Sequence, residues 1–363
     1  MTYSVCLIPG DGVGQEVIPA AAEVLGATGL PIEFVWADAG WACFERTGDA
    51  LPPATVEAIQ ACGVALFGAT QSPMSKVAGY RSPILALRKT FDLYANIRPT
   101  RSLPAPDTRQ GLDFVIVREN TEDLYAGLEH VVVPGVVESL KIITEKASTR
   151  IGHYAFELAR REHRHRVTSV HKANIMKLSD GLFLECTRKV AKEYPDIAYD
   201  EVIVDAMSMH LVMRPETFDV LVMENLYGDI ISDLASGLVG GLGLTPSGNI
   251  GEKAAVFEAV HGSAPDIAGK GIANPTAVML SGVMMLRHLG KLDIAARLEK
   301  AIFDVIAEHQ HVTRDLGGTA SIDEYTDAVI AKLDESVPHH EIVPPRPKAA
   351  ARHKAKLATK PEA

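Results

Sequence analysis

NLYGDIISDLASGLVGGLGLTPSGNIG, residues 225–251, is the segment around which the rest of the chain is organised. Asp229 and Asp233 are four residues apart, so on a helix both carboxylates project from the same face. Four apolar residues cover the other faces of this helix: Ile230, Ile231, Leu234 and Leu238. We therefore expect it to be buried on most sides. The glycine run and the following TPSGNIG are poor helix material and predict a tight turn and a loop.

Two carboxylates on one buried helix face repel each other and are costly to desolvate unless a positive charge lies between them. A hard divalent cation such as Mg²⁺ or Mn²⁺ would supply that charge, because it takes oxygen ligands and tolerates retained waters. The alternative is an acidic pair that favours the N-terminal dipole of the helix and contacts only solvent. The spacing of Asp229 and Asp233 leaves both interpretations open.

Length and composition indicate an ordinary globular enzyme. The chain has 363 residues, of which 47% are hydrophobic and 23% charged, and its net charge of −10 disfavours a general nucleic-acid binder. Its cysteines, Cys6, Cys43, Cys62 and Cys186, lack zinc-like spacing and are expected to be reduced core thiols. No signal peptide or membrane-spanning apolar run is recognisable, so we expect a soluble, cytoplasmic protein.

Strand and helix patterns alternate along the chain. Strands are predicted at 5–8, 32–37, 64–67, 114–117, 167–170, 201–205 and 255–260, and helices at 15–25, 53–61, 147–161, 276–289, 292–309 and 322–333. This alternation implies parallel strands with helical crossovers in an α/β layer structure. Gly10, Gly12 and Gly14 follow the first strand, but Gln15 occupies the third glycine position of a GxGxxG fingerprint. The cofactor is therefore not assigned to this loop.

Three later strands end in residues that can carry chemistry: Arg118, Lys172 and Asp205. A lysine at a strand end is usually solvated, whereas one that faces a metal and arginines can serve as a base. Arg88 and Arg98 join Arg118 in apolar surroundings, and three converging guanidiniums would suit a di- or tricarboxylic acid. Taken singly, each arginine is better explained by a surface or structural salt bridge.

Six motifs together resemble the β-decarboxylating dehydrogenases: IPGDGVGQE, LYANIRP, VRENTEDLYAG, HKANI, NLYGDIISDLASGLVGGLG and HGSAPDIAGKGIANP. That family comprises isocitrate, isopropylmalate, homoisocitrate and D-malate/tartrate dehydrogenases, and the resemblance runs from about residue 3 to residue 335. It implies an α/β fold with an isopropylmalate dehydrogenase-like open sheet domain (1–100 and 253–340). A smaller α/β dimerisation domain (101–252) would build a homodimer or a dimer of dimers, and a basic tail (341–363) is expected to be disordered.

The resemblance also implies roles for individual residues. The substrate would contact Ser82, Arg88, Arg98, Arg118 and Asn174. Mg²⁺ or Mn²⁺ would be bound by Asp205, Asp229 and Asp233. Tyr125 and Lys172 would be the acid/base pair, assisted by Asp205, with Lys172 and one aspartate reaching across from the second subunit. The dinucleotide would contact Thr70, His261, Gly262, Ser263, Ala264, Asp266, Ile267 and Asn274.

The choice of cofactor can be argued from charge. NADP-using relatives carry lysine followed by tyrosine where this chain has Asp266 and Ile267. A carboxylate hydrogen-bonds a ribose diol and repels a 2′-phosphate, so we expect NAD. The alternative is that Asp266 is merely solvated.

The choice of substrate depends on the residues before Arg88. Isocitrate enzymes usually show a Ser-x-Asn pair here, whereas this chain has Ser82 and Ile84, and the glutamate of isopropylmalate enzymes is absent. The phrase GYRSPILALR looks most like homoisocitrate dehydrogenases of lysine biosynthesis. One methylene is worth only roughly 1–3 kcal/mol of discrimination, so overlap with isocitrate is expected. Isopropylmalate, malate and tartrate stay open as further alternatives.

Two hypotheses of other classes also remain open. Relatives of this fold serve as non-catalytic regulatory subunits, which are expected to lose part of the Tyr/Lys/Asp set that this chain keeps. The basic tail from 344 onward could bind an anionic surface or nucleic acid, against the alternative of a solvated tail without function.

Overall fold

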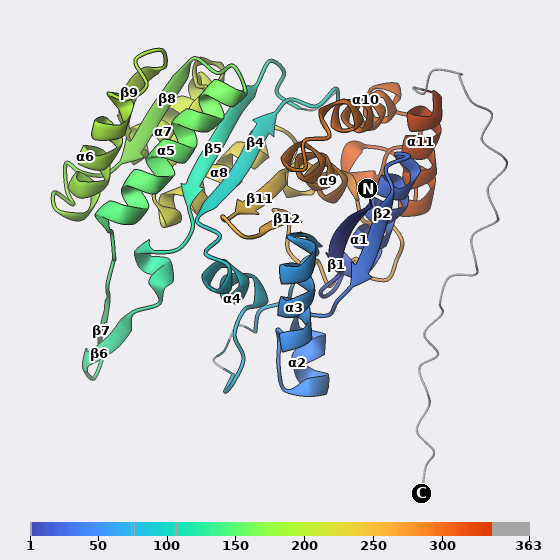
Figure 1. Ribbon diagram of the computed structural model, residues 1–363, viewed down its shortest axis with the longest axis horizontal. Helices are drawn as coiled ribbons and strands as arrows, with labels where there is room; N and C mark the ends of the chain where they lie inside the picture. Colours follow the sequence, from blue (N-terminus) through green and yellow to red (C-terminus); the bar gives the residue numbers. More distant parts are fainter. Residues whose placement is uncertain (1, 74, 76, 106–107, 336–363) are drawn as a thin grey trace, which may run out of the picture.

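The computed structural model describes residues 2–73, 75, 77–105 and 108–335. It has a mixed α/β fold around one ten-stranded sheet (Figure 1). In spatial order the strands are β2 (Ile32–Trp36), β1 (Tyr3–Ile8), β3 (Val64–Phe67), β12 (Ala255–Ala259), β11 (Pro246–Ile250), β4 (Ala95–Arg101), β5 (Asp113–Glu119), β10 (Val220–Met223), β8 (Arg166–His171) and β9 (Ala198–Ile203). A separate hairpin, β6 (Glu129–Val133) and β7 (Val136–Ser139), projects from the body.

The large sheet consists of two parallel halves that run in opposite directions. The central pairings β12–β11, β11–β4 and β4–β5 are antiparallel, and the other neighbouring strands pair in parallel. The carboxyl ends of β1, β3 and β12 therefore lie at one edge of the sheet. Those of β5, β10, β8 and β9 lie at the opposite edge.

Helices cover both faces of both halves. One face packs against α1 (Gly14–Ala27), α9 (Thr276–His288), α10 (Leu292–Glu308) and α11 (Ile322–Glu335) in the first half and α5 (Glu145–Arg161) and α6 (Ser179–Ala191) in the second. The other face packs against α3 (Pro53–Cys62) and α4 (Pro83–Thr90), then α7 (Val204–Met213) and α8 (Asn225–Leu238). A short helix α2 (Trp41–Thr47) and the 3₁₀ turns η1 (Asp123–Ala126), η2 (Pro215–Thr217), η3 (Leu242–Leu244) and η4 (Arg314–Leu316) complete the described elements.

The main error of the sequence analysis concerns TPSGNIG, which was expected to be a loop. Residues 246–250 form β11, which pairs with β12 on one side and β4 on the other. Gly248 is suited to this place because a Cβ there would lie 3.0 Å from the Phe257 ring. Pairing on both sides overrides the weak strand propensity of proline, serine and glycine.

Two smaller expectations also need correction. α8 is not buried on most sides: Ile231 and Ala235 pack inward, but Ile230 is 56% exposed. Asp205 does not end a strand, because β9 stops at Ile203 and Asp205 lies in the first turn of α7.

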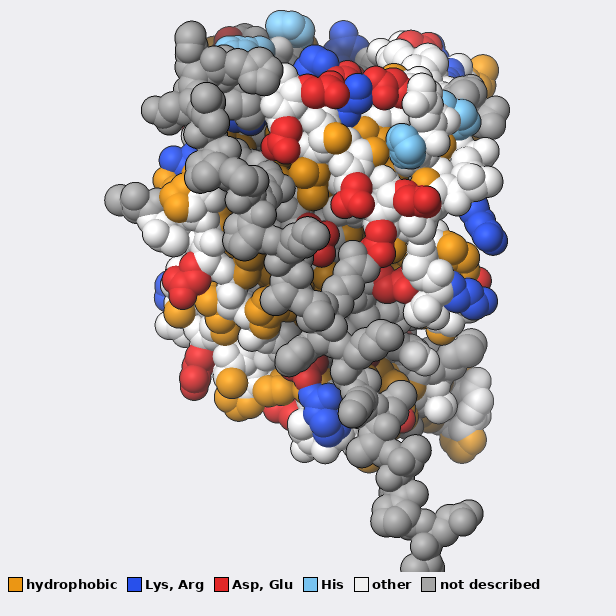
Figure 2. All heavy atoms as spheres, turned by 90° about the vertical axis from the view of Figure 1, so that its right-hand side faces the viewer, with side chains coloured by type: hydrophobic (Ala, Val, Ile, Leu, Met, Phe, Trp, Pro, Cys, Tyr) orange, Lys and Arg blue, Asp and Glu red, His pale blue; other side chains and the backbone are white. Residues whose placement is uncertain are grey.

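The surface and the domain division add two observations. Acidic side chains are spread over the face at the α10–α11 end without forming one patch (Figure 2). No helix within the described ranges is long and apolar enough to cross a membrane. One continuous sheet runs through both proposed domains, whose boundaries stay a prediction, and the basic tail lies outside the described residues.

Candidate active site

The three arginines singled out from the sequence converge on the sheet face that α4 and α8 cover. Arg88 lies in the last turn of α4, Arg98 on β4 and Arg118 on β5, and we call them the arginine cluster. Their relative exposures are only 6%, 6% and 1%, so none is a surface residue. Burial, and after it the neighbouring Arg118, lower the pKa of Arg98 to about 10.

The two aspartates of α8 lie beside this cluster. Asp229 forms ion pairs with Arg118 and, at 3.6 Å, with Arg98, while Asp233 lies 3.4 Å from Arg98. The Tyr125 hydroxyl donates a 2.5 Å hydrogen bond to Asp229. The geometry thus brings Tyr125, Asp229, Asp233 and the arginines into one group.

Charges and burial set the protonation of this group. Burial pushes the pKa of Asp229 upward, but Arg118, Tyr125 and Arg98 together hold it below its ordinary value. Burial, and the hydrogen bond to Asp229, raise the pKa of Tyr125. Tyr125 therefore keeps its proton at neutral pH beside an ionised carboxylate, as a general acid requires.

Lys172 and Asp205 form a second group. Lys172 directly follows β8, and its Nζ donates to the Asp205 carboxylate, which lowers the pKa of Asp205. The Lys172 backbone N–H is held by buried Asp180 at 2.6 Å. The nearby Asn174 is exposed, and Leu178, four residues further on, is 91% exposed.

The predicted metal ligands are therefore divided between the two groups. Asp229 and Asp233 offer oxygen donors on one helix face, but Asp205 is not grouped with them. Among the described residues, no three His, Cys, Asp or Glu side chains are close enough to hold a metal ion. One chain fits two ligands of a divalent cation, and a complete set requires a further carboxylate.

The residues predicted to bind the dinucleotide follow the carboxyl ends of β3 and β12, and the loop after β1 contacts both segments. The Val13 N–H donates to the Ser263 carbonyl (2.9 Å), and the Asp11 N–H donates to the Ala69 carbonyl (2.7 Å), next to Thr70. Within the β12 loop, His261 Nε2 is buried without a hydrogen-bond partner among the described residues. An unpaired buried nitrogen at a strand end is compatible with a bound polar ligand.

The rest of this loop is braced from two sides. Glu16 on α1 accepts a 2.9 Å hydrogen bond from the Gly271 N–H. Asn274 donates to Asp315 at 2.8 Å, while Asp266 is exposed. The sequence does not single out Glu16 or Asp315. Their hydrogen-bond partners, Gly271 and Asn274, are 255 and 41 positions away along the chain, so no local pattern connects them.

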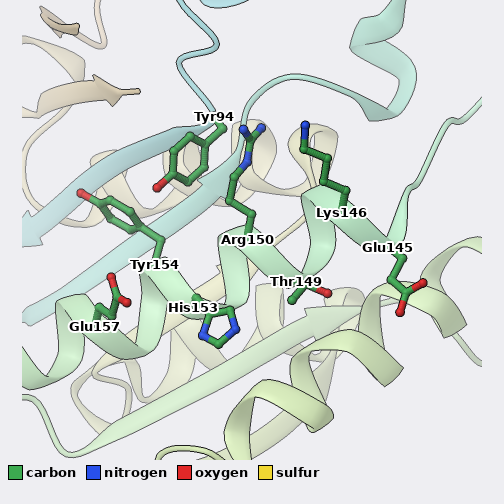
Figure 3. A pocket seen from close by; sticks show the side chains of 8 residues that line it. All are labelled: Tyr94, Glu145, Lys146, Thr149, Arg150, His153, Tyr154 and Glu157. Carbon is green, nitrogen blue, oxygen red and sulfur yellow. The ribbon is translucent and has the colours of Figure 1, made fainter. Parts of the chain in front are cut away.

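Ser82 precedes α4, and Ile84 in its first turn packs partly against the core beneath. A hollow of about 510 Å³ lies elsewhere, on the outer face of α5, where Arg150 stacks on Tyr94 at 4.1 Å (Figure 3). It contains none of the predicted site residues.

Comparison with known proteins identifies the family. The family model "Isocitrate/isopropylmalate dehydrogenase" matches residues 4–329, so the chain belongs to this family of dehydrogenases. The chain is 54% identical over 333 residues to the isocitrate/homoisocitrate dehydrogenase of Thermus thermophilus, covering 92% of this chain and 99% of the relative.

Two further relatives place it more closely. Isocitrate dehydrogenase [NAD] catalytic subunit 5, mitochondrial, of Arabidopsis thaliana is 53% identical, over 90% of this chain and 87% of the relative. The crystal structure of isocitrate dehydrogenase from Methylococcus capsulatus superimposes with a TM-score of 0.88 at 49% identity, over 91% of this chain and 99% of that one.

Proposed function

We propose that the protein catalyses the NAD-dependent oxidative decarboxylation of homoisocitrate to 2-oxoadipate and CO₂, with isocitrate as the alternative substrate. The observation that carries the proposal is the buried arginine cluster, which lies beside a tyrosine that keeps its proton and two aspartates. Buried guanidiniums are costly unless anions reach them. Once Asp229 and Asp233 bind a divalent cation, a tricarboxylate would supply the anions that Arg98 and Arg118 then need. The name of the Thermus thermophilus relative includes both substrates.

The proposed chemistry gives each of these side chains one role. Lys172, with Asp205, accepts the proton of the 2-hydroxyl as the hydride on C2 passes to nicotinamide C4 of NAD⁺. The bond from C3 to its carboxylate then breaks, and its electron pair stays on the C2–C3 enolate as CO₂ leaves. Tyr125, which is protonated at neutral pH, donates a proton to C3.

The metal would be held by Asp229 and Asp233 of one chain and Asp205 of a second. Bound there, Mg²⁺ or Mn²⁺ would act as a Lewis acid on the oxygens of the substrate. This arrangement explains why the ligands of a single chain lie in two groups, and it requires at least a homodimer.

Steady-state kinetics test the proposal. We expect kcat/KM for NAD reduction with Mg²⁺ or Mn²⁺ to be at least about tenfold higher for homoisocitrate than for 3-isopropylmalate or D-malate, since one pocket contact is worth roughly 1–3 kcal/mol. Isocitrate in first place would make the alternative correct. Binding of the acids without turnover would indicate a regulatory subunit instead.

A further inference from the structure

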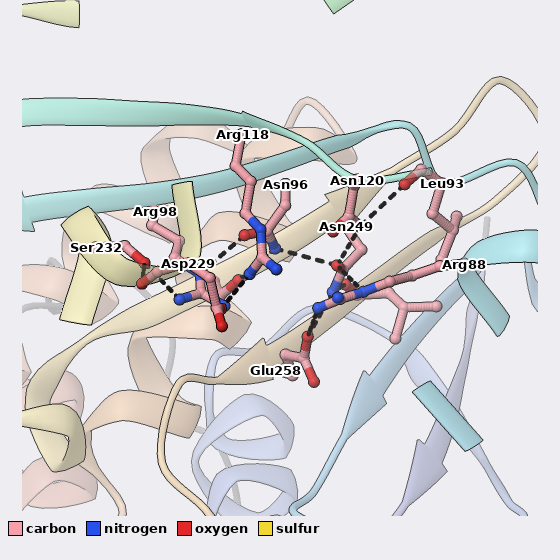
Figure 4. Close-up of polar contacts among 12 residues, drawn as sticks. Arg88, Leu93, Asn96, Arg98, Arg118, Asn120, Asp229, Ser232, Asn249 and Glu258 are labelled. Carbon is pink, nitrogen blue, oxygen red and sulfur yellow. Dashed lines mark hydrogen bonds and ion pairs between the residues drawn. The ribbon is translucent and has the colours of Figure 1, made fainter. Parts of the chain in front are cut away.

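Each guanidinium of the arginine cluster donates a hydrogen bond from its Nε–H group to the side chain of one asparagine. The Nε–H groups donate to amide oxygens as follows: Arg88 to Asn249 (3.2 Å), Arg98 to Asn96 (2.8 Å) and Arg118 to Asn225 (3.0 Å). All three asparagines are fully buried. Figure 4 shows Arg88, Arg98 and Arg118 side by side, with Asn96 and Asn249 between them.

Strand register produces this arrangement. Asn249 on β11 lies opposite Asn96 on β4, and Asn96 lies opposite Arg118 on β5. Three antiparallel strands thus place polar side chains in one row across the sheet. Asn225, the first residue of α8, approaches the row from the covering helix.

Contacts with other acceptors fix the orientation of two of the amides, those of Asn225 and Asn249. Asn225 Nδ2 donates to the Glu122 carbonyl at 3.2 Å. Asn249 Nδ2 donates to the Val256 carbonyl at 3.2 Å and to Glu258 at 2.7 Å. Turning either amide around would set an oxygen against these acceptors, so the amide oxygen must face the arginine.

A neutral acceptor suits this position for an electrostatic reason. In a buried site a carboxylate behind the guanidinium would cancel its charge before a substrate arrives. An amide oxygen fixes the direction of the guanidinium but leaves the charge in place. Beyond its contacts with Asn249 and Glu258, Arg88 has no hydrogen-bond partner in the part of the chain that the structure describes, so its Nη1 group stays available.

We infer that Asn96, Asn225 and Asn249 are positioning residues that aim the arginine cluster at the substrate carboxylates without neutralising it. The inference deepens the proposed function and rests on its assignment of the cluster to substrate. Acidic partners are present as well, but they contact the Nη groups, where a substrate carboxylate can displace them.

Asn225→Asp is the least disruptive test. It keeps the oxygen that faces Arg118, and it replaces the hydrogen bond to the Glu122 carbonyl by a contact between two oxygens. The probe is tricarballylate, a tricarboxylate without a hydroxyl group, with binding measured by calorimetry on the full chain. We expect its Kd and the KM for the hydroxy acid to rise about tenfold or more, while kcat changes less than about threefold and the KM for NAD stays the same.

Gln110→Glu is the matched control, because it also exchanges an amide for a carboxylate and loses hydrogen bonds to backbone carbonyls. Gln110 Nε2 donates to the carbonyls of Leu103 and Thr108 at 3.0 and 3.1 Å, in the connection between β4 and β5 and at the far end of these strands from Asn96 and Arg118. We expect a much smaller change in tricarballylate binding and in melting temperature. Asn249→Asp provides a second test at Arg88.

The outcomes separate the inference from the proposed function. A folded Asn225→Asp protein that binds tricarballylate within about twofold of wild type would overturn the inference, as would equal weakening by Gln110→Glu or no binding by wild type. Wild-type protein that binds tricarballylate, loses binding on Asn225→Asp, and oxidises no hydroxytricarboxylate would uphold the inference and reject the function.

Discussion

At the scale of single residues, the candidate site depends on three buried guanidiniums, each of which donates from Nε to a buried asparagine. Arg88, Arg98 and Arg118 were selected for their affinity for carboxylates, and they do converge. Their asparagine partners were not selected, because an asparagine in a strand pattern carries no signal until the strand register is known. The register of β11 could not be predicted, because TPSGNIG was expected to form a loop.

Cofactor preference is a residue-scale prediction. Replacing Asp266 by Lys together with Ile267 by Tyr removes a carboxylate that would repel a 2′-phosphate and adds a cation that would attract it. We expect the ratio of kcat/KM for NADP to that for NAD to rise about tenfold or more, with the KM for the hydroxy acid unchanged. Lys270→Ala, exposed in the same loop, is the control. An unchanged ratio in the double variant would show that Asp266 does not face the ribose.

At the scale of elements, the strands and helices that were predicted agree with the structure to within a few residues. The elements β4, β10, α4, α6 and α7 were not predicted, and β11 was predicted to be a loop. The apolar residues of β3 and α5 predict these elements from the local sequence alone. The segment 246–250 is determined by its neighbours on both sides, which a single sequence does not reveal. The glycine loop after β1 also has a role that its own sequence does not reveal. The sequence excludes a dinucleotide-binding GxGxxG motif there, and the structure shows that the loop supports the β12 loop.

A substitution at Gly12 tests whether the loop after β1 supports the β12 loop. Its φ is +56°, and a Cβ there would lie 2.0 Å from the Ser263 carbonyl oxygen. We expect Gly12→Ala to lower stability by about 1–3 kcal/mol and to raise the KM for NAD more than the KM for the hydroxy acid. Gly26→Ala in α1, where no atom lies within 4 Å, should instead stabilise by about 0.5–1 kcal/mol. Equal KM values for NAD in wild type and Gly12→Ala would show that NAD binding does not depend on the contact between the β1 loop and the β12 loop.

The junction of β10 and α8 predicts a pH dependence. Burial raises the pKa of Glu224 to about 8, although Lys141 opposes the shift. A carboxyl with a higher pKa in the folded state binds its proton more tightly there, so it costs stability as pH rises from its unfolded pKa of about 4.3 through 8. We expect the melting temperature of Glu224→Gln to fall less than that of wild type between pH 5 and pH 8. Parallel curves would show that Glu224 does not titrate in this window, and Glu185→Gln on the surface is the control.

At the scale of the whole molecule, the proposed function accounts for the two separate groups of site residues by a second chain that supplies one of them. Exposed apolar residues are available for such contact on the β6–β7 hairpin, after β8 and on α7: Val131 (66%), Val137 (63%), Leu178 (91%) and Met213 (67%). The proposed homodimer would complete the Tyr125 group of one chain with the Lys172 group of the other.

Mixing two inactive variants tests this arrangement. Tyr125→Phe and Lys172→Met should each lower kcat on the order of 10²–10⁴-fold. If sites are shared, a mixed dimer has one intact site, and random re-pairing should restore about a quarter of wild-type activity. Activity that stays at the sum of the separate variants would place both residues in a site within one chain.

The most direct measurement is the yield of NADH and of CO₂ from a known, limiting amount of homoisocitrate, made with the full chain, excess NAD and Mg²⁺ or Mn²⁺. The account predicts equal yields of the two products, and no NADH after chelation of the metal until it is added back. NADH without CO₂, or no reaction with either homoisocitrate or isocitrate, would contradict it.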